Sequence, residues 1–198
     1  SLQINPNNSE CYSNRGVVNF KLKKIEEAIS DYKKAISIDK NNYNAFFNLG
    51  NLYKEINKLD ESIENLSEAI KINKNFYNAY HNRAVVKRLL FRFEDAIKDF
   101  DEALKINPKY FDSLFFKAIT QLKIGDYENG WKNYEYRWEA TNFPSPKRIF
   151  RQPCWNGIDD LNDKIILLHG EQGLGDNIHF SRYFCLIKSK AKKTILQV

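Results

Sequence analysis

A pattern that recurs every 34 residues is the feature that most limits what this chain can fold into. Small residues occupy one position of the pattern in four successive copies, namely Gly16, Gly50, Ala84 and Ala118. A second position holds an apolar residue followed by an acid in every copy, at Ile25, Leu59, Phe93 and Tyr127. Because the size class of the residue is kept from copy to copy, the sequence predicts a solenoid of stacked, equivalent units.

Each copy is expected to form two helices joined by a short turn. In the second copy, apolar residues follow the i, i+3, i+4 spacing of one helix face, which indicates helices over about 43–56 and 60–72. Gly50 in the first helix and Ala69 in the second carry little side chain. The two helices can therefore pack closely against each other.

The small–aromatic–small spacing of the second helix resembles that of tetratricopeptide repeats. It is present as Ala28–Tyr32–Ala35 and again as Ala96–Phe100–Ala103. The resemblance implies a mostly α-helical tetratricopeptide solenoid with four repeats, at residues 9–42, 43–76, 77–110 and 111–142. Residues 1–8 align with the end of a repeat, and the chain begins without Met. We therefore expect the tail of a truncated repeat there, in a fragment of a longer protein whose cut end exposes apolar surface for oligomerisation.

In this family the first helix of each repeat lines the concave face, and here that helix carries a series of amides. Residues at i and i+4 share one face of a helix, so successive repeats would align these amides as a ladder. An amide both donates and accepts hydrogen bonds and can hold a peptide backbone. His81 is a further candidate contact. The predicted protein- or peptide-binding residues are Asn14, Asn44, Asn48, Asn78, His81 and Asn82.

Alternatives to the peptide-binding interpretation stay open at this stage. The asparagines could be ordinary solvated amides, and a single surface histidine usually has no binding role. Arg15 and Arg83 stand beside the small residue of their helices, where most such helices carry an apolar residue. They could attract an acidic peptide end, or they could extend from the helix interface toward water.

Composition excludes several other classes of protein. The net charge of +6 comes mostly from scattered lysines, which indicates a solvated surface; nucleic-acid binding is not expected. Three widely spaced cysteines exclude a disulfide framework and a CxxC zinc site, and they favour a reducing, cytoplasmic location without a metal. No apolar run approaches the ~20 residues of a membrane span.

A second domain is expected after the repeats. Residues 143–163 contain three prolines and several large apolar side chains, and we interpret them as an ordered connector. The apolar run 164–169 predicts a buried strand. A glycine-rich turn, a helix over 176–189 and a strand over 194–198 follow it. This strand–helix–strand order is the start of a Rossmann-like α/β domain.

Two segments of this region, 153–157 and 167–183, resemble the junction in bacterial tetratricopeptide proteins fused to a glycosyltransferase of the family 9 or heptosyltransferase type. The resemblance implies a nucleotide sugar as donor, with no other cofactor, and a fragment that lacks the donor-binding half and is inactive alone. It implies that Asp176 is the catalytic base, although this residue could simply cap the helix. Implied nucleotide-binding residues are Gly170, Gln172, Gly173 and Gly175.

Two other functions remain open from the sequence. The chain could be a non-catalytic interaction scaffold, or an enzyme that uses the same glycine-rich turn to bind another nucleotide or S-adenosylmethionine. Whether the protein is an enzyme is therefore undecided at this stage.

Overall fold

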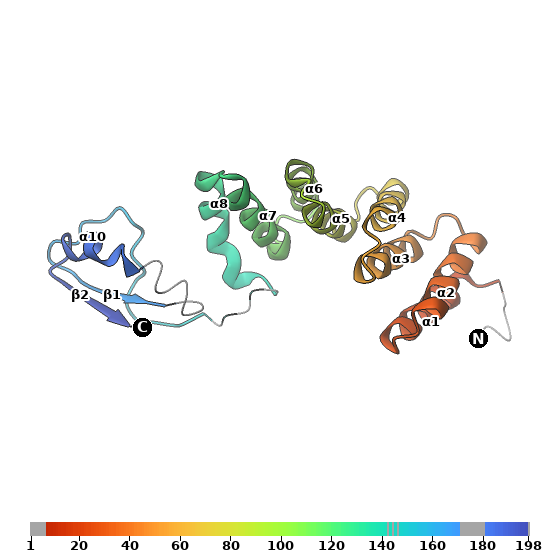
Figure 1. The fold of residues 1–198 in the computed structure, drawn as a ribbon, viewed down its shortest axis with the longest axis horizontal. Coiled ribbons are helices and arrows are strands. Elements are labelled where there is room, and N and C mark those ends of the chain that lie inside the picture. Colours follow the sequence, from red (N-terminus) through yellow and green to blue (C-terminus); the bar gives the residue numbers. More distant parts are fainter. Residues whose placement is uncertain (1–6, 142, 144, 146, 171–180, 198) are drawn as a thin grey trace. The chain divides into compact units, whose positions relative to one another are not determined.

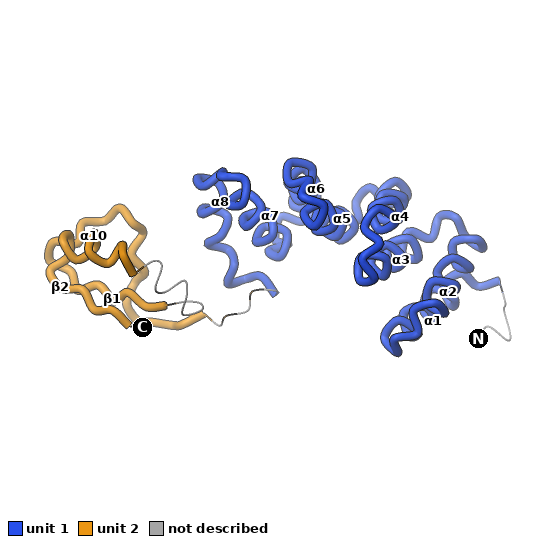
Figure 2. The backbone as a smooth tube through the Cα atoms, in the orientation of Figure 1, with its two compact units in different colours: residues 1–142 blue, residues 143–198 orange. Residues whose placement is uncertain are grey.

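A computed structural model describes residues 7–141, 143, 145, 147–170 and 181–197. The chain divides into two compact units, residues 1–142 and 143–198 (Figure 2). Most of the predicted tail of a truncated repeat, residues 1–6, lies outside the described residues.

The first unit is a stack of helix pairs (Figure 1). Short turns join α1 (Ser9–Lys21) to α2 (Ile25–Ile38), α3 (Tyr43–Glu55) to α4 (Leu59–Ile72), α5 (Tyr77–Leu89) to α6 (Phe93–Ile106), and α7 (Phe111–Ile124) to α8 (Tyr127–Tyr134). A 3₁₀ helix, η1 (Glu135–Glu139), follows α8. The mostly helical solenoid predicted from the 34-residue period is confirmed.

The turn inside each helix pair has the same backbone geometry. One residue per turn adopts a left-handed conformation, at Lys23, Asn57, Phe91 and Gly125, with φ values of 62°, 60°, 59° and 87°. The next residue donates its N–H to a carbonyl five residues earlier, as Lys24 does to Asn19 at 2.9 Å. This is the Schellman arrangement that ends a helix and reverses the chain.

Close packing within the pairs follows from the small residues. A Cβ atom added at Gly50 would lie 2.8 Å from Cγ of Leu66, and one added at Gly16 would lie 2.7 Å from the ring of Tyr32. The second helices contribute large side chains, 34 residues apart, that are almost completely buried: Tyr32, Leu66 and Phe100. Each of the first three pairs therefore buries one large residue of its second helix against a small residue of its first helix.

The second unit contains β1 (Ile165–His169), α10 (Phe184–Lys188) and β2 (Lys193–Gln197). The two strands are parallel, with Ile165 opposite Lys193. A two-stranded sheet is too small to show a Rossmann-like domain. The expected burial of the first strand is also wrong for this structure, because Ile165 is 62% exposed and Leu167 is 41% exposed.

Candidate functional site

The first helices of the four pairs form the inner side of the stack. In this series α1 contacts α3, α3 contacts α5 and α5 contacts α7, and each of the four helices also contacts its own partner. The sixth residue of the first three repeats is Asn14, Asn48 or Asn82, and each lies on one of these inner helices. Asn44 and Asn78 lie one helical turn before two of them.

Most of these amide side chains are free to bind a ligand. Asn14 and Asn44 are exposed, whereas Asn48 and Asn78 are half-buried. Within the described residues, the side chains of these four asparagines make no hydrogen bond. An amide that has no partner within the protein can pair with both the donors and the acceptors of a ligand.

Asn82 is different because its side-chain amide already forms a hydrogen bond within the protein. Its Nδ2 donates to Oδ1 of Asn51 at 2.7 Å, which links α5 to α3. Asn51 was not predicted from the sequence. The equivalent residues of the other repeats are Val17, Val85 and Ile119, so the repeat pattern carries no signal for this bond.

A polar hollow with a volume of about 360 Å³ lies where α1 meets the start of α3. It brings together two predicted residues from successive repeats, Asn14 and Asn44. The hollow is lined by Glu10, Ser13, Asn14, Asp39, Asn41, Asn42, Tyr43 and Asn44.

The wall of this hollow is held in place by a chain of hydrogen bonds. Oδ1 of Asn42 accepts from the N–H of Ala45 at 2.9 Å and so caps α3. Nδ2 of Asn42 donates to Oγ of Ser9 at 2.7 Å, and Ser9 donates to the carbonyl of Ala35. These bonds tie the first repeat to the second, so the hollow is formed before any ligand arrives.

His81 does not lie on the inner surface. It is 5% exposed, and its Nδ1 lies 2.8 Å from Oγ of Ser113 on α7. The rings of Phe100, Tyr110 and Phe116 surround it at centroid distances of 5.0–5.6 Å. Burial lowers the pKa of His81 to about 4, so the ring is neutral at pH 7. This position does not support direct contact with a ligand.

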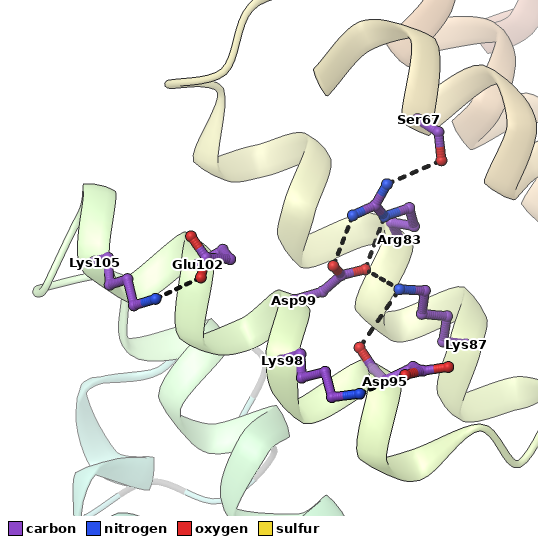
Figure 3. A network of polar contacts seen from close by, with 8 residues as sticks. All are labelled: Ser67, Arg83, Lys87, Asp95, Lys98, Asp99, Glu102 and Lys105. Carbon is purple, nitrogen blue, oxygen red and sulfur yellow. Dashed lines mark hydrogen bonds and ion pairs between the residues drawn. The ribbon is translucent and has the colours of Figure 1, made fainter. Parts of the chain in front are cut away.

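Arg15 and Arg83 are engaged inside their own repeats. Nε of Arg15 donates to Asp31 at 2.8 Å, and Nε of Arg83 donates to Asp99 at 2.8 Å. Figure 3 shows that Lys87 also reaches Asp99. Both carboxylates are buried, and the two arginines bridge the helices of a pair; the Arg83 side chain is 18% exposed, whereas that of Arg15 is 52% exposed.

Arg88 is a further cation that the sequence argument missed. Its guanidinium lies 5.1 Å from the ring centroid of Phe116, the residue that replaces asparagine in the fourth repeat. Its Nε is buried and has no hydrogen-bond partner within the described residues. Burial lowers the pKa of Arg88 from its usual value.

The glycine-rich turn is only partly described. Gly170 follows β1 and donates its N–H to the carbonyl of Gln197 at 3.3 Å. The other predicted residues of this turn, Gln172, Gly173, Gly175 and Asp176, lie outside the described residues. In the part of the chain that is described, no three His, Cys, Asp or Glu side chains group to hold a metal ion, and no helix is long and apolar enough to cross a membrane.

Comparison with known families defines the class of the helical unit. A model described as "TPR repeat" matches residues 20–56 and 50–87, and one described as "Tetratricopeptide repeat" matches residues 77–110. The chain therefore contains tetratricopeptide repeats, as the sequence pattern predicted. These family matches end at residue 110 and give no support to the resemblance of the C-terminal region to a glycosyltransferase.

Solved structures with the same fold include three of different kinds. A crystal structure of MamA is 21% identical, with a TM-score of 0.64 over 68% of this chain and 79% of that chain. PilF of Pseudomonas aeruginosa is 20% identical, with a TM-score of 0.65 over 68% of this chain and 62% of that chain. The first TPR of Spaghetti (RPAP3), bound to the HSP90 peptide SRMEEVD, is 23% identical, with a TM-score of 0.57 over 59% and 92%. No curated protein matches the chain.

Proposed function

We propose that the inner face of α1, α3 and α5 binds an extended peptide segment of a partner protein. The observation that carries this proposal is the set of four unpaired amides on that face: Asn14, Asn44, Asn48 and Asn78. Such amides can pair with both the N–H and the C=O groups of a peptide backbone. A neighbour with this fold holds an HSP90 peptide, which is further support for a peptide as the ligand.

The test is selection of binders from a displayed library of random 12-residue peptides, followed by calorimetry. We expect Asn48→Ala together with Asn78→Ala to weaken binding of a selected peptide by roughly tenfold, because two amide contacts are lost. Asn65→Ala is the control, since Asn65 bonds to the carbonyl of Glu61 on its own helix. A library that yields no binder, or equal affinities for the double variant and the wild type, would overturn the proposal.

We also propose that the C-terminal unit takes part in sugar transfer from a nucleotide donor. The support is its resemblance to such enzymes, together with the parallel β1 and β2, with α10 between them and Gly170 directly after β1. In this reaction the acceptor oxygen attacks the anomeric carbon, the bond to the nucleotide diphosphate breaks, and Asp176 takes the acceptor proton.

Calorimetry on the full-length protein with UDP-glucose, NAD and S-adenosylmethionine distinguishes the candidate activities. Sugar-nucleotide binding with turnover that Asp176→Ala abolishes is the expected result. Preferential binding of NAD or S-adenosylmethionine would favour a different enzyme. Absence of all binding would favour a non-catalytic scaffold.

A further inference from the structure

The charge of the polar hollow between α1 and α3 is opposite to that of the chain as a whole. The chain has a net charge of +6, but the hollow is lined by two carboxylates, Glu10 and Asp39, and by no Lys, Arg or His. Within the described residues, Glu10 has no ion pair or hydrogen bond from its side chain. One oxygen of Asp39 accepts from the N–H of Asn41 at 2.9 Å, which leaves the other oxygen open.

A hydroxyl that opens onto the same hollow also has no hydrogen bond within the described residues. Ser13 is 5% exposed and lines the hollow, and its hydroxyl makes no hydrogen bond to any described residue. Other buried serines of the unit are satisfied: Ser62 donates to the carbonyl of Gly50 at 2.7 Å, and Ser113 bonds to His81. The Ser13 hydroxyl is therefore accessible from the hollow although the residue is mostly buried, and a ligand in the hollow can form a hydrogen bond with it.

The residues of α1 that line the hollow share one helix face. Glu10, Ser13 and Asn14 are spaced i, i+3 and i+4, so their side chains face the same volume. Asn44 approaches that volume from the next repeat. Together they offer a carboxylate, a hydroxyl oxygen and amide oxygens, which are the acceptors that an ammonium or guanidinium group requires.

We propose that this hollow binds a cationic side chain, lysine or arginine, of the peptide that occupies the inner face. This inference rests on the proposed peptide-binding function and adds the chemistry of one subsite. Glu10 supplies the opposite charge, and Ser13 and the two amides accept the donors of the cation. The hydrogen bonds of Asn42 and Ser9 fix the wall, so little ordering is needed when the cation enters.

The test uses a library-selected peptide that contains a lysine, with matched peptides in which this lysine is arginine, methionine or glutamate. Affinities are measured by calorimetry for the wild type and for Glu10→Gln, Ser13→Ala and Glu10→Lys. Glu64→Gln is the control, since Glu64 is an exposed and unpaired carboxylate on α4, outside the hollow. A melting curve for each variant establishes that it is folded.

We expect Glu10→Gln to weaken binding of the lysine peptide by roughly fivefold and to leave the methionine peptide unchanged. Glu10→Lys should reverse the preference, so that the glutamate peptide binds best, which a purely structural role of Glu10 would not produce. The wild-type preference for lysine should shrink in 1 M salt.

Two results would overturn the inference, and they differ in what they imply for the proposed function. In the first, selected peptides bind with no preference for lysine or arginine and bind equally well to Glu10→Gln. This result would contradict the cation subsite but leave the proposed peptide-binding function intact. A library that yields no binder at all would remove both.

Discussion

Arg83 and Asp99 form a bidentate ion pair that joins α5 to α6. Nε of the arginine lies 2.8 Å from Oδ2 of the aspartate, and Nη2 lies 2.7 Å from Oδ1 (Figure 3). Asp99 is 6% exposed and also pairs with Lys87 at 2.8 Å. At the equivalent positions of the second repeat stand Leu49 and Asn65, so the fold accepts an uncharged pair there.

The first prediction concerns this pair. Asp99→Asn should lower the free energy of unfolding by about 3 kcal/mol, because it leaves Arg83 partly buried without its carboxylate. Adding Arg83→Leu recreates the pair of the second repeat and should recover most of that loss. Urea unfolding followed by circular dichroism measures both variants. A double variant as unstable as Asp99→Asn alone would contradict the explanation.

The second prediction concerns the pH dependence that His81 gives to the fold. Its pKa is about 4 in the folded chain and ordinarily about 6.5, so the unfolded chain binds a proton first as the pH falls. Burial is the largest cause; nearby Lys54 and Arg88 also lower this pKa, and Asp112 raises it. The contribution of His81 to the free energy of unfolding is fully present above pH 6.5. It is lost between pH 6.5 and 4, which lowers that free energy by up to about 3 kcal/mol.

Melting temperatures measured from pH 7 to pH 4 test this prediction. The matched variant is His81→Phe with Ser113→Ala, because Phe47 and Ala79 stand at the equivalent positions of the preceding repeats. This variant should lose much less stability than the wild type over that range. Equal losses in the two proteins would assign the pH dependence to other groups.

The sequence predicted the helix pairs well because the 34-residue period fixes which face of each helix is buried. His81 was expected on the surface because only its own helix was considered, but its side chain is buried. Phe47 and Phe115 stand at the same repeat position, and that comparison points to a buried side chain. The hollow at Glu10 could not be predicted from the sequence, because it combines residues of α1 with the turn before α3, about 30 positions later in the chain.

The C-terminal unit was harder to predict for a different physical reason. The apolar run of β1 is typical of a strand that is covered on both faces. Here Ile165 and Leu167 are exposed, so the pattern predicted the strand but not its surroundings.

The third prediction concerns the close approach of α3 and α4. A Cβ atom at Gly50 would lie 2.8 Å from Cγ of Leu66 and 3.2 Å from the carbonyl oxygen of Ser62. Gly50→Ala should therefore destabilise the chain by about 1–2 kcal/mol, since the overpacking outweighs the gain in helix propensity. Ala84→Gly, at the equivalent position of the third repeat, should also destabilise, by about 1 kcal/mol. Stabilisation by Gly50→Ala, measured by urea unfolding, would show that α4 can shift away.

The last prediction concerns the left-handed turn residue of the third repeat. Phe91 has a φ of 59° and is 75% exposed, so its large side chain sits on an unfavourable backbone with little burial in return. Its contact with the ring of Phe93, at 6.0 Å between centroids, is a weak compensation. Asn57 occupies the same turn position in the second repeat, and asparagine tolerates this conformation.

Phe91→Asn should therefore stabilise the chain by about 0.5–1 kcal/mol, and Asn57→Phe should destabilise it by a similar amount. Urea unfolding of the two variants beside the wild type gives both changes. Opposite signs are required by the backbone argument, because the turn geometry is the same in the two repeats. If both substitutions shifted stability in the same direction, the side-chain contacts of each turn would outweigh its backbone conformation.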